Sequence, residues 1–382
     1  MRRSSGFNSD DESPIKWFDW GIMKSSKAPT QSFFSIEDVV QSLTELKLWV
    51  ETVSPGENPK EKNLSSVSAV ESGGPGALVF VDKADFISQV ANNRPTLVVT
   101  SEKLRGALAE ISGVCVVIAK SVPLAHAFLK QRFGGRNYAA SGWEGLHPSA
   151  VVHPSAEIAS DAVIEPRVVV GANTKVGSGS RLMAGVVVEN DVQIGSRVVI
   201  HPNVTVGYGT QIGNDVVIEA GTVIGSEGFG FAQDASRKSH AIPQTGIVVL
   251  EDRVRVGAGC CIDRAAYEET RIGAGTKIDN LCHIAHNVKI GQDCLLTAML
   301  CVAGSTTIGN RVITSGQTGI LDHMKVADDV VLLHRAGVTK DVEKPGAYAG
   351  LPLQPLGDYM KNQAVLRNAV ELRQRVSDLE KK

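Results

Sequence analysis

The sequence has no uninterrupted apolar run that approaches the about 18 residues of a membrane-spanning helix, so we expect no transmembrane segment. Aromatic residues make up only 5% of the chain and the formal net charge is −2, which argues against a nucleic-acid-binding surface. Met1 is followed by two arginines and then by acidic residues at 10–12, not by the apolar core of a secretory signal. These absences favour a cytoplasmic protein.

Cysteine is sparse, and no two cysteines stand in a C-x-x-C arrangement. The six are Cys115, Cys260, Cys261, Cys282, Cys294 and Cys301. Five of them fall in a repetitive region, where a thiol can serve as a small apolar filler. We therefore expect reduced structural thiols, without disulfides and without a metal site.

Aliphatic residues recur at every sixth position over two long stretches of the chain. One series is unbroken, and the other has the single exception Thr314. The first series is Val152, Ile158, Ile164, Val170, Val176, Leu182, Val188, Ile194, Ile200, Val206, Ile212, Ile218 and Ile224. The second is Ile272, Ile278, Ile284, Ile290, Leu296, Val302, Ile308, Thr314, Ile320, Val326, Leu332 and Val338.

This period is neither that of a strand nor that of a helix, and a fixed short repeat indicates a solenoid. Three hexads make one triangular coil, so residues eighteen apart lie on the same side, and coils stack about 4.8 Å apart. The pattern is that of hexapeptide repeats in a left-handed parallel β-helix, which we place at 147–353. The prediction is thus a mainly β fold. Periodicity alone also permits a structural spike or an ice-binding surface.

The flanking regions have different textures. Residues 1–34 are polar and serine-rich and predict a disordered extension. Residues 35–140 combine a helix capped by Ser35 with short β-rich runs, as in a small α/β domain. Residues 356–382 read as a C-terminal α-helix with one apolar side, which needs a partner; three copies around a trimer axis would supply one.

The solenoid pattern breaks twice. The first break, from Ser226 to about Val249, contains Phe229 and Phe231 among glycines. Long loops that leave a rigid scaffold are more often functional than idle, and glycines let a ligand approach the backbone closely. The second break adds four residues around Tyr267 before the ladder resumes at Ile272.

Two histidines in the second ladder are candidates for chemistry. His286 stands beside a predicted corner, and Gly304 lies one coil above it, where its bare backbone N–H could act as an oxyanion donor. Imidazole, with an unperturbed pKa of about 6.5, suits a general base at neutral pH. Asp279 could hold the ring in one tautomer, and His323 falls on the same wall two coils on.

The segments Asp279–Val288, Gly225–Phe231, Ile262–Arg264 and Pro345–Pro355 together resemble the UDP-3-O-acylglucosamine N-acyltransferases of lipid A biosynthesis. The resemblance runs from about Ser35 to the C-terminus. It implies a uridine-binding α/β domain, a β-helix and a C-terminal helix, assembled as a homotrimer with sites between subunits. It also implies transfer of a 3-hydroxyacyl group from acyl carrier protein to the 2-amino group of a UDP-3-O-acylglucosamine.

The resemblance also implies roles for particular residues. His286 is the general base, Gly304 the oxyanion donor, Asp279 the orienting carboxylate and His323 a substrate-binding residue. A second set matches positions that bind substrate, including the aromatic pair that sandwiches uracil: Phe80, Phe86, Lys83, Asn280, Phe229 and Phe231. Arginines of the C-terminal helix (Arg367, Arg373 and Arg375) are available to the acidic carrier protein. No cofactor is needed because a thioester is already activated.

Two departures leave alternatives open. Phe86 stands where the family commonly has tyrosine, and Lys83 where it often has asparagine. A non-catalytic homologue, or an acyltransferase for another nucleotide amino sugar, therefore remains a competing interpretation. A zinc-dependent solenoid carbonic anhydrase that uses His283, His286 and His323 is a second alternative. The acyl-chain length is not encoded in any pattern that we recognise.

Overall fold

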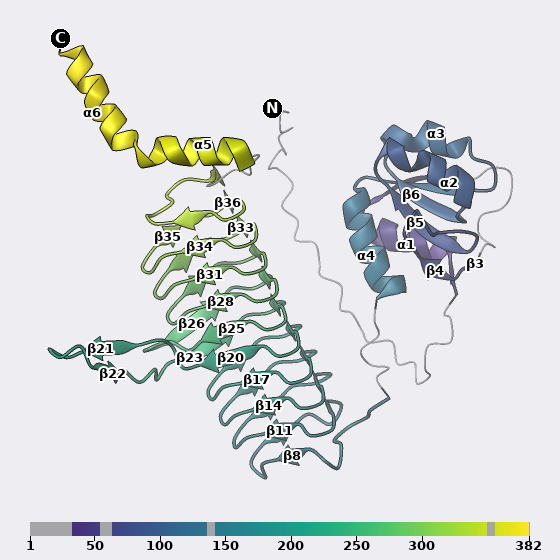
Figure 1. Ribbon diagram of the computed structural model, residues 1–382. Coiled ribbons are helices and arrows are strands. Elements are labelled where there is room, and N and C mark those ends of the chain that lie inside the picture. The colour runs from purple at the N-terminus through teal and green to yellow at the C-terminus, as the bar shows by residue number, and fades with distance from the viewer. Residues whose placement is uncertain (1–32, 54–62, 136–141, 350–355, 382) are drawn as a thin grey trace. The chain divides into compact units, whose positions relative to one another are not determined.

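The computed structural model describes residues 33–53, 63–135, 142–349 and 356–381 (Figure 1). The chain divides into two compact units, Met1–Gly142 and Trp143–Lys382, which are treated separately below. Most of the predicted 1–34 extension lies outside the described residues. Phe34, however, belongs to the first unit, because it pairs with Leu64 and stacks on Phe133 with ring centroids 4.3 Å apart. Phe34 is therefore part of the packed core of this unit.

The first unit is a five-stranded sheet with helices packed against it, as the sequence predicts. The strand order is β2 (Trp49–Val53), β7 (Cys115–Ala119), β6 (Leu97–Thr100), β5 (Ala77–Val81) and β4 (Ser66–Val67). Only the β2–β7 pairing is antiparallel. The helices are α1 (Ile36–Glu45), α2 (Ile87–Asn93), α3 (Arg105–Ala109) and α4 (Val122–Gly134), and a small ribbon pairs β1 (Phe34–Ser35) with β3 (Asn63–Leu64).

Helix α1 begins where the capping signal predicts. The Ser35 hydroxyl accepts a hydrogen bond from the backbone N–H of Asp38 at 3.1 Å, and the Asp38 carboxylate accepts one from the backbone N–H of Ser35 at 2.7 Å. This reciprocal box satisfies donors that the first helical turn would otherwise leave unpaired. The two hydrogen bonds to Ser35 are the main reason that the pKa of the Asp38 carboxyl lies below its ordinary value.

The second unit is a three-sided parallel β-helix, so the predicted solenoid is confirmed. Sheet I contains β10 (Val163–Ile164), β13 (Arg181–Leu182), β16 (Val199–Ile200), β19 (Val217–Ile218), β24 (Arg255–Val256), β27 (Lys277–Ile278), β30 (Leu295–Leu296), β33 (Ile313–Thr314), β36 (Val330–Leu332) and β38 (Gly346–Tyr348). Sheet II contains β8 (Val151–Val152), β11 (Val169–Val170), β14 (Val187–Val188), β17 (Thr205–Val206), β20 (Val223–Ser226), β25 (Cys261–Asp263), β28 (His283–Ile284), β31 (Cys301–Val302), β34 (Gly319–Ile320) and β37 (Gly337–Val338). Sheet III contains β9 (Glu157–Ile158), β12 (Lys175–Val176), β15 (Gln193–Ile194), β18 (Gln211–Ile212), β23 (Ile247–Leu250), β26 (Glu269–Ile272), β29 (Lys289–Ile290), β32 (Thr307–Ile308) and β35 (Lys325–Val326).

The residues of the six-residue ladder form the core of this prism. Val170 pairs with Val188, and Ile200 with Ile218, in the predicted eighteen-residue register. Ile200 and Ile218 are completely buried. Thr314, the one polar member of the ladder, is also buried, and its hydroxyl accepts a hydrogen bond from the backbone N–H of Thr297 at 3.1 Å. The buried hydroxyl of Thr314 is therefore hydrogen-bonded, which compensates for its polarity in the core.

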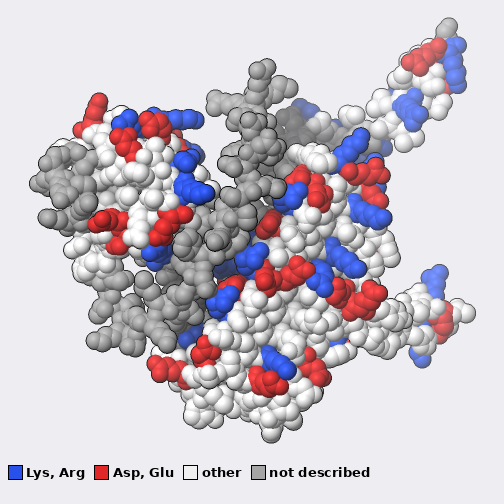
Figure 2. Space-filling view, turned by 180° about the vertical axis from the view of Figure 1, so that it is seen from behind, with Lys and Arg blue, Asp and Glu red and all other residues white. Residues whose placement is uncertain are grey.

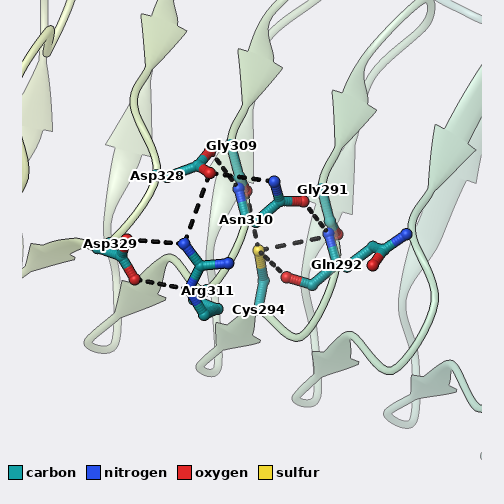
Figure 3. A network of polar contacts seen from close by, with 8 residues as sticks. All are labelled: Gly291, Gln292, Cys294, Gly309, Asn310, Arg311, Asp328 and Asp329. Atoms are coloured by element: carbon teal, nitrogen blue, oxygen red, sulfur yellow. Dashed lines mark hydrogen bonds and ion pairs between the residues drawn. The ribbon is translucent and has the colours of Figure 1, made fainter. Parts of the chain in front are cut away.

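The corners are stabilised by polar side chains that bridge neighbouring coils (Figure 3). The side-chain oxygen of Asn310 accepts a hydrogen bond from the backbone N–H of Gln292 at 2.8 Å. The backbone N–H of Asn310 donates to the Asp328 carboxylate at 2.8 Å. Arg311 forms an ion pair with Asp329 at 2.7 Å. Because each bridge ties one coil to the next, the corners contribute a specific register as well as a turn.

Two insertions shift the register, as the sequence predicts. The first carries the hairpin of β21 (Phe231–Gln233) and β22 (Ser239–Ala241), which projects from the solenoid between β20 and β23 (Figure 1). The second separates β25 from β26, so that Ile262 pairs with Ile284, twenty-two residues on.

The C-terminal segment forms two helices instead of the single predicted one. They are α5 (Leu356–Arg367) and α6 (Ala369–Glu380), which meet at Asn368. Apolar side chains of α6 are exposed, including Val370 at 84% and Leu379 at 69%. Throughout the described ranges, no helix is both long enough and apolar enough to cross a membrane.

Replacement of a core ladder residue should destabilise the prism much more than replacement of its outward neighbour. Ile212 is 4% exposed, whereas Gln211 beside it is exposed. We expect Ile212→Ala to lower the free energy of unfolding by about 2–5 kcal/mol because of the lost contacts and the cavity. Gln211→Ala is the matched control and should change it by less than about 0.5 kcal/mol. Chemical denaturation followed by circular dichroism measures both, and equal effects would contradict the assignment of the core.

Candidate active site

His286 lies at the corner that follows β28, between sheets II and III, and it is half-buried. Its Nδ1 is 3.1 Å from Oδ1 of Asn287. That amide is fixed from both sides, because Oδ1 accepts from the backbone N–H of Ala266 at 3.0 Å and Nδ2 donates to the Tyr267 carbonyl at 3.1 Å. An amide oxygen can only accept, so Nδ1 carries the proton in this contact. Nε2 of the neutral ring is then left as the basic nitrogen.

Gly304 lies directly against this basic nitrogen. A Cβ at position 304 would stand 2.7 Å from both Cε1 and Nε2 of His286, so only glycine leaves room for the ring. The backbone N–H of Gly304 has no hydrogen-bond partner among the residues that the structure describes. The predicted proximity of His286 and Gly304 is confirmed, whereas their catalytic roles remain predictions.

His323 lies one coil above Gly304 on the same corner. Its backbone N–H donates to the Gly304 carbonyl at 3.0 Å, and its side chain is exposed. The backbone N–H of Ser305 donates to the carbonyl of His286 at 2.9 Å. These two bonds hold the three coils in register, so His286, Gly304 and His323 form one column, as the spacing predicts.

The glycine-rich loop packs on the other side of His286. A Cβ at Gly228 would stand 2.8 Å from the Cβ of His286 and 3.0 Å from Oε1 of Gln244. Gln244 is 3% exposed and is held by Glu227, which accepts its backbone N–H at 2.8 Å. Its Oε1 has no partner in the described part of the chain. No motif or spacing in the sequence singles out Gln244.

The two phenylalanines of this loop point away from the protein interior. Phe229 is 83% exposed and Phe231 is 51% exposed, with ring centroids 5.0 Å apart. They form an exposed aromatic pair at the base of the hairpin. Their predicted contact with substrate is therefore still a prediction.

Asp279 does not lie beside His286 within the chain. It follows β27 at the corner between sheets I and II, where its carboxylate accepts from the backbone N–H groups of Asn280 at 2.8 Å and Ala298 at 3.2 Å. Asn280 at the same corner accepts from the backbone N–H of Ala258 at 2.7 Å. Asp279 and Asn280 thus bridge coils at a different corner, and the role of Asp279 in orienting the ring stays a prediction.

The carboxylate that does approach the site is that of Asp263, on the coil below His286. It is 5% exposed, accepts a hydrogen bond from the Ser226 hydroxyl at 2.7 Å, and lies 3.7 Å from Nε2 of His283. Burial raises the pKa of the Asp263 carboxyl, while the Ser226 hydrogen bond and the nearby His283 and His286 act to lower it.

Arg264, the next residue, is 2% exposed. Its guanidinium donates to the carbonyls of Gly225 at 2.9 Å and Tyr208 at 3.3 Å, and its Cζ lies 3.5 Å from the Tyr208 ring centroid. The arginine thus ties the coil of the site to the two coils below the hairpin insertion. It is a packing and hydrogen-bonding element at the base of the loop.

The predicted uracil-binding residues lie in the first unit. Phe80 packs with the cluster on one face of the sheet and stacks on His126, with ring centroids 4.4 Å apart. Phe86 packs with the cluster on the other face, and Lys83 is exposed between them. The assignment of Phe80 and Phe86 to uracil binding stays a prediction.

Within the described ranges, no three His, Cys, Asp or Glu side chains are grouped closely enough to hold a metal ion. All six cysteines are free.

Positive and negative side chains are intermixed along the face of the solenoid seen in Figure 2, with no large region of one sign.

Comparisons with known proteins place these features in a family. The GMPPB C-terminal domain family matches residues 146–229. Among solved structures, a UDP-N-acetylglucosamine acyltransferase from Arabidopsis is 26% identical, with a TM-score of 0.48 over 58% of this chain and 76% of that one.

Two relatives match nearly the whole chain. A UDP-3-O-acylglucosamine N-acyltransferase from Cupriavidus pinatubonensis is 36% identical over 325 residues, or 83% of this chain and 89% of its own length. The enzyme of the same name from Methylococcus capsulatus is 47% identical over 318 residues, or 83% of this chain and 90% of its own length. The chain therefore belongs to the UDP-3-O-acylglucosamine N-acyltransferase family.

Proposed function

We propose that the protein transfers a 3-hydroxyacyl group from acyl carrier protein to the 2-amino group of UDP-3-O-(3-hydroxyacyl)-glucosamine in lipid A biosynthesis. Membership of an N-acyltransferase family supports the reaction class. The observation that carries the site assignment is the contact between Nε2 of His286 and the open backbone of Gly304. A base and a hydrogen-bond donor at one point are what amide formation from a thioester requires.

The reaction proceeds by attack of the acceptor amine on the thioester carbonyl carbon. As the C–N bond forms, Nε2 of His286 takes a proton from the attacking nitrogen, and the carbonyl oxygen becomes an oxyanion that accepts the Gly304 N–H. Collapse of this intermediate breaks the C–S bond. The departing thiolate of the carrier's phosphopantetheine then receives the proton from the imidazolium, which restores the neutral ring.

Substrate binding is assigned to groups around this centre. His323 lies on the next coil of the same corner with its side chain exposed, where it can meet the acceptor. Phe80, Phe86 and Lys83 would recognise the uridine, since a flat base gains from stacking on aromatic rings. Asn280, Phe229 and Phe231 complete the set, and Asp279 could act on a neighbouring subunit's site.

We further propose that the protein works as a homotrimer in the cytoplasm. Sheets I and II expose aliphatic side chains, such as Leu295 at 48% and Val169 at 38%, although sheet I also exposes Lys277. Apolar faces of this kind are typical of subunit interfaces. Free thiols are typical of a reducing compartment. The exposed arginines Arg367, Arg373 and Arg375 are suited to an acidic carrier protein.

The test is turnover by the purified protein. We expect an amide product, identified by mass spectrometry, when the protein is incubated with 3-hydroxyacyl carrier protein and UDP-3-O-acylglucosamine. The matched control replaces the acceptor by its 2-N-acetyl form, which has no free amine and should give no product. Absence of product with the free amine, under conditions in which a relative from the family is active, would overturn the proposal.

A further inference from the structure

The strongest unassigned feature near the site is the buried carboxylate of Asp263. It is 5% exposed, and no arginine or lysine forms an ion pair with it in the described chain. Among the residues that the structure describes, the Ser226 hydroxyl donates to one of its oxygens at 2.7 Å, and no donor is within hydrogen-bond distance of the other. A desolvated carboxylate with a single neutral donor is poorly compensated, so it gains strongly from any positive charge that appears beside it.

The groups around Asp263 are mainly imidazoles. His283 lies on β28 directly above Cys261, and its Nε2 is 3.7 Å from the second oxygen of Asp263. His286 follows at the end of the same strand, and a Cβ at Gly228 would stand 2.8 Å from the His286 Cβ and 3.3 Å from the carbonyl oxygen of Arg264, the residue next to Asp263. Cys261, on the same strand as Asp263, is the other titratable neighbour; burial first and the Asp263 charge second raise the pKa of its thiol, so it stays neutral. The positive charge that Asp263 can stabilise is therefore an imidazolium.

The neighbouring charges do not compete for this role. The Arg264 guanidinium, on the next residue, is directed to the carbonyls of Gly225 and Tyr208. The Asp279 carboxylate is occupied by two backbone N–H groups at another corner. Asp263 is thus the buried carboxylate whose field falls on the two histidines.

We infer that Asp263 is a positioning residue for the acyl transfer, whose negative charge stabilises the imidazolium formed when His286 takes the proton from the acceptor amine, with His283 as a second imidazole in the same field. This inference rests on the proposed function of His286. The carboxylate has one neutral hydrogen-bond donor, the Ser226 hydroxyl, and a proton taken up by His286 places an opposite charge near it. Such an arrangement favours the charged intermediate over the ground state.

The test is the pH dependence of kcat for Asp263→Asn, a substitution that keeps the shape and can retain the Ser226 hydrogen bond. We expect kcat to fall about 10- to 100-fold, since one pKa unit of lost charge stabilisation corresponds to a factor of ten. The acid limb of the profile should move to lower pH, because without the negative charge the imidazole loses its proton more readily. KM for the acceptor should change little. Ser226→Ala removes the hydrogen bond that lowers the pKa of the Asp263 carboxyl, so a larger fraction of Asp263 should be protonated and the acid limb should move by a smaller amount in the same direction.

Asp215→Asn is the matched control, because Asp215 is ion-paired with Arg197 at another corner and should leave both kcat and the profile unchanged. Thermal unfolding establishes that each variant is folded. A wild-type profile retained in both Asp263→Asn and Ser226→Ala overturns the inference while leaving the proposed function intact. A shift in Asp279→Asn without one in Asp263→Asn overturns it equally. Absence of turnover in the wild-type protein is instead the failure of the proposed function.

Discussion

Replacement of His286 by alanine should reduce kcat about 10²- to 10⁴-fold, the range expected when a positioned general base is removed. The reason lies in the tautomer: Asn287 holds the Nδ1 proton, so Nε2 is the nitrogen that faces Gly304. The three heavy atoms nearest to a Cβ built at Gly304 all belong to the His286 ring. The measurement is the initial rate of amide formation from 3-hydroxyacyl carrier protein and the UDP-sugar acceptor, with substrate concentrations above KM.

His153→Ala is a suitable control for this experiment. His153 is an exposed histidine of the first coils, where its Nδ1 accepts from the backbone N–H of Ser155 at 3.2 Å. It should retain wild-type kcat. If the His286→Ala variant kept both the wild-type circular dichroism spectrum and the wild-type rate, the assignment of His286 as the general base would be contradicted.

Replacement of Gly304 by alanine should lower kcat about 100-fold, a cost typical of an ångström-scale displacement of a catalytic group. The added methyl group would stand 2.7 Å from Cε1 and Nε2 of His286, which is too close for both to keep their places. The ring must rotate away, and the new methyl group also obstructs the N–H donor. Because the substitution leaves the His286 side chain in place, a lower kcat would show that the position of the imidazole matters and not only its presence.

Gly337→Ala provides the comparison, since a Cβ at that glycine meets nothing within 4 Å. It should leave kcat unchanged. If Gly304→Ala were as active as Gly337→Ala, the ring would not need its present position. A crystal structure of the alanine variant would then show where the imidazole lies.

Most of the fold could be predicted from the sequence because the residues of the six-residue repeat are the ones that form the buried core. Each ladder residue recurs on the same inner face, and even the exception at Thr314 is buried. The stacking of His286 under Gly304 followed from the same eighteen-residue arithmetic. The break between α5 and α6 at Asn368 was not predicted, because apolar spacing continues across it.

The site carboxylate escaped prediction for a related reason. Asp263 lies below the coil of His286 only because the insertion around Tyr267 stretches the repeat to twenty-two residues at this point. Regular spacing directs attention to Asp279 instead, which turns out to bridge coils at a different corner. Sequence spacing identifies a residue's coil but not the direction in which its side chain leaves a corner.

The predicted uracil-binding pair, Phe80 and Phe86, packs against different clusters of the first unit. Strand alternation sends Leu78 and Phe80 to one face of the sheet and Val79 to the other, and Phe86 packs with Val79. The family resemblance assigns Phe80 and Phe86 to uracil binding, but it does not predict where the two rings lie before a ligand binds.

The stacking of equal coils also constrains how such a chain can change length. Gain or loss of a full eighteen residues, for example between Val170 and Val188, would restore every pairing above and below it. A gain of eighteen residues between His286 and Gly304 would preserve the prism, but it would place an additional coil between the imidazole and the Gly304 backbone. Length variation among descendants of this chain should therefore accumulate in whole turns toward the first coils, and it should spare the three consecutive turns that bear His286, Gly304 and His323.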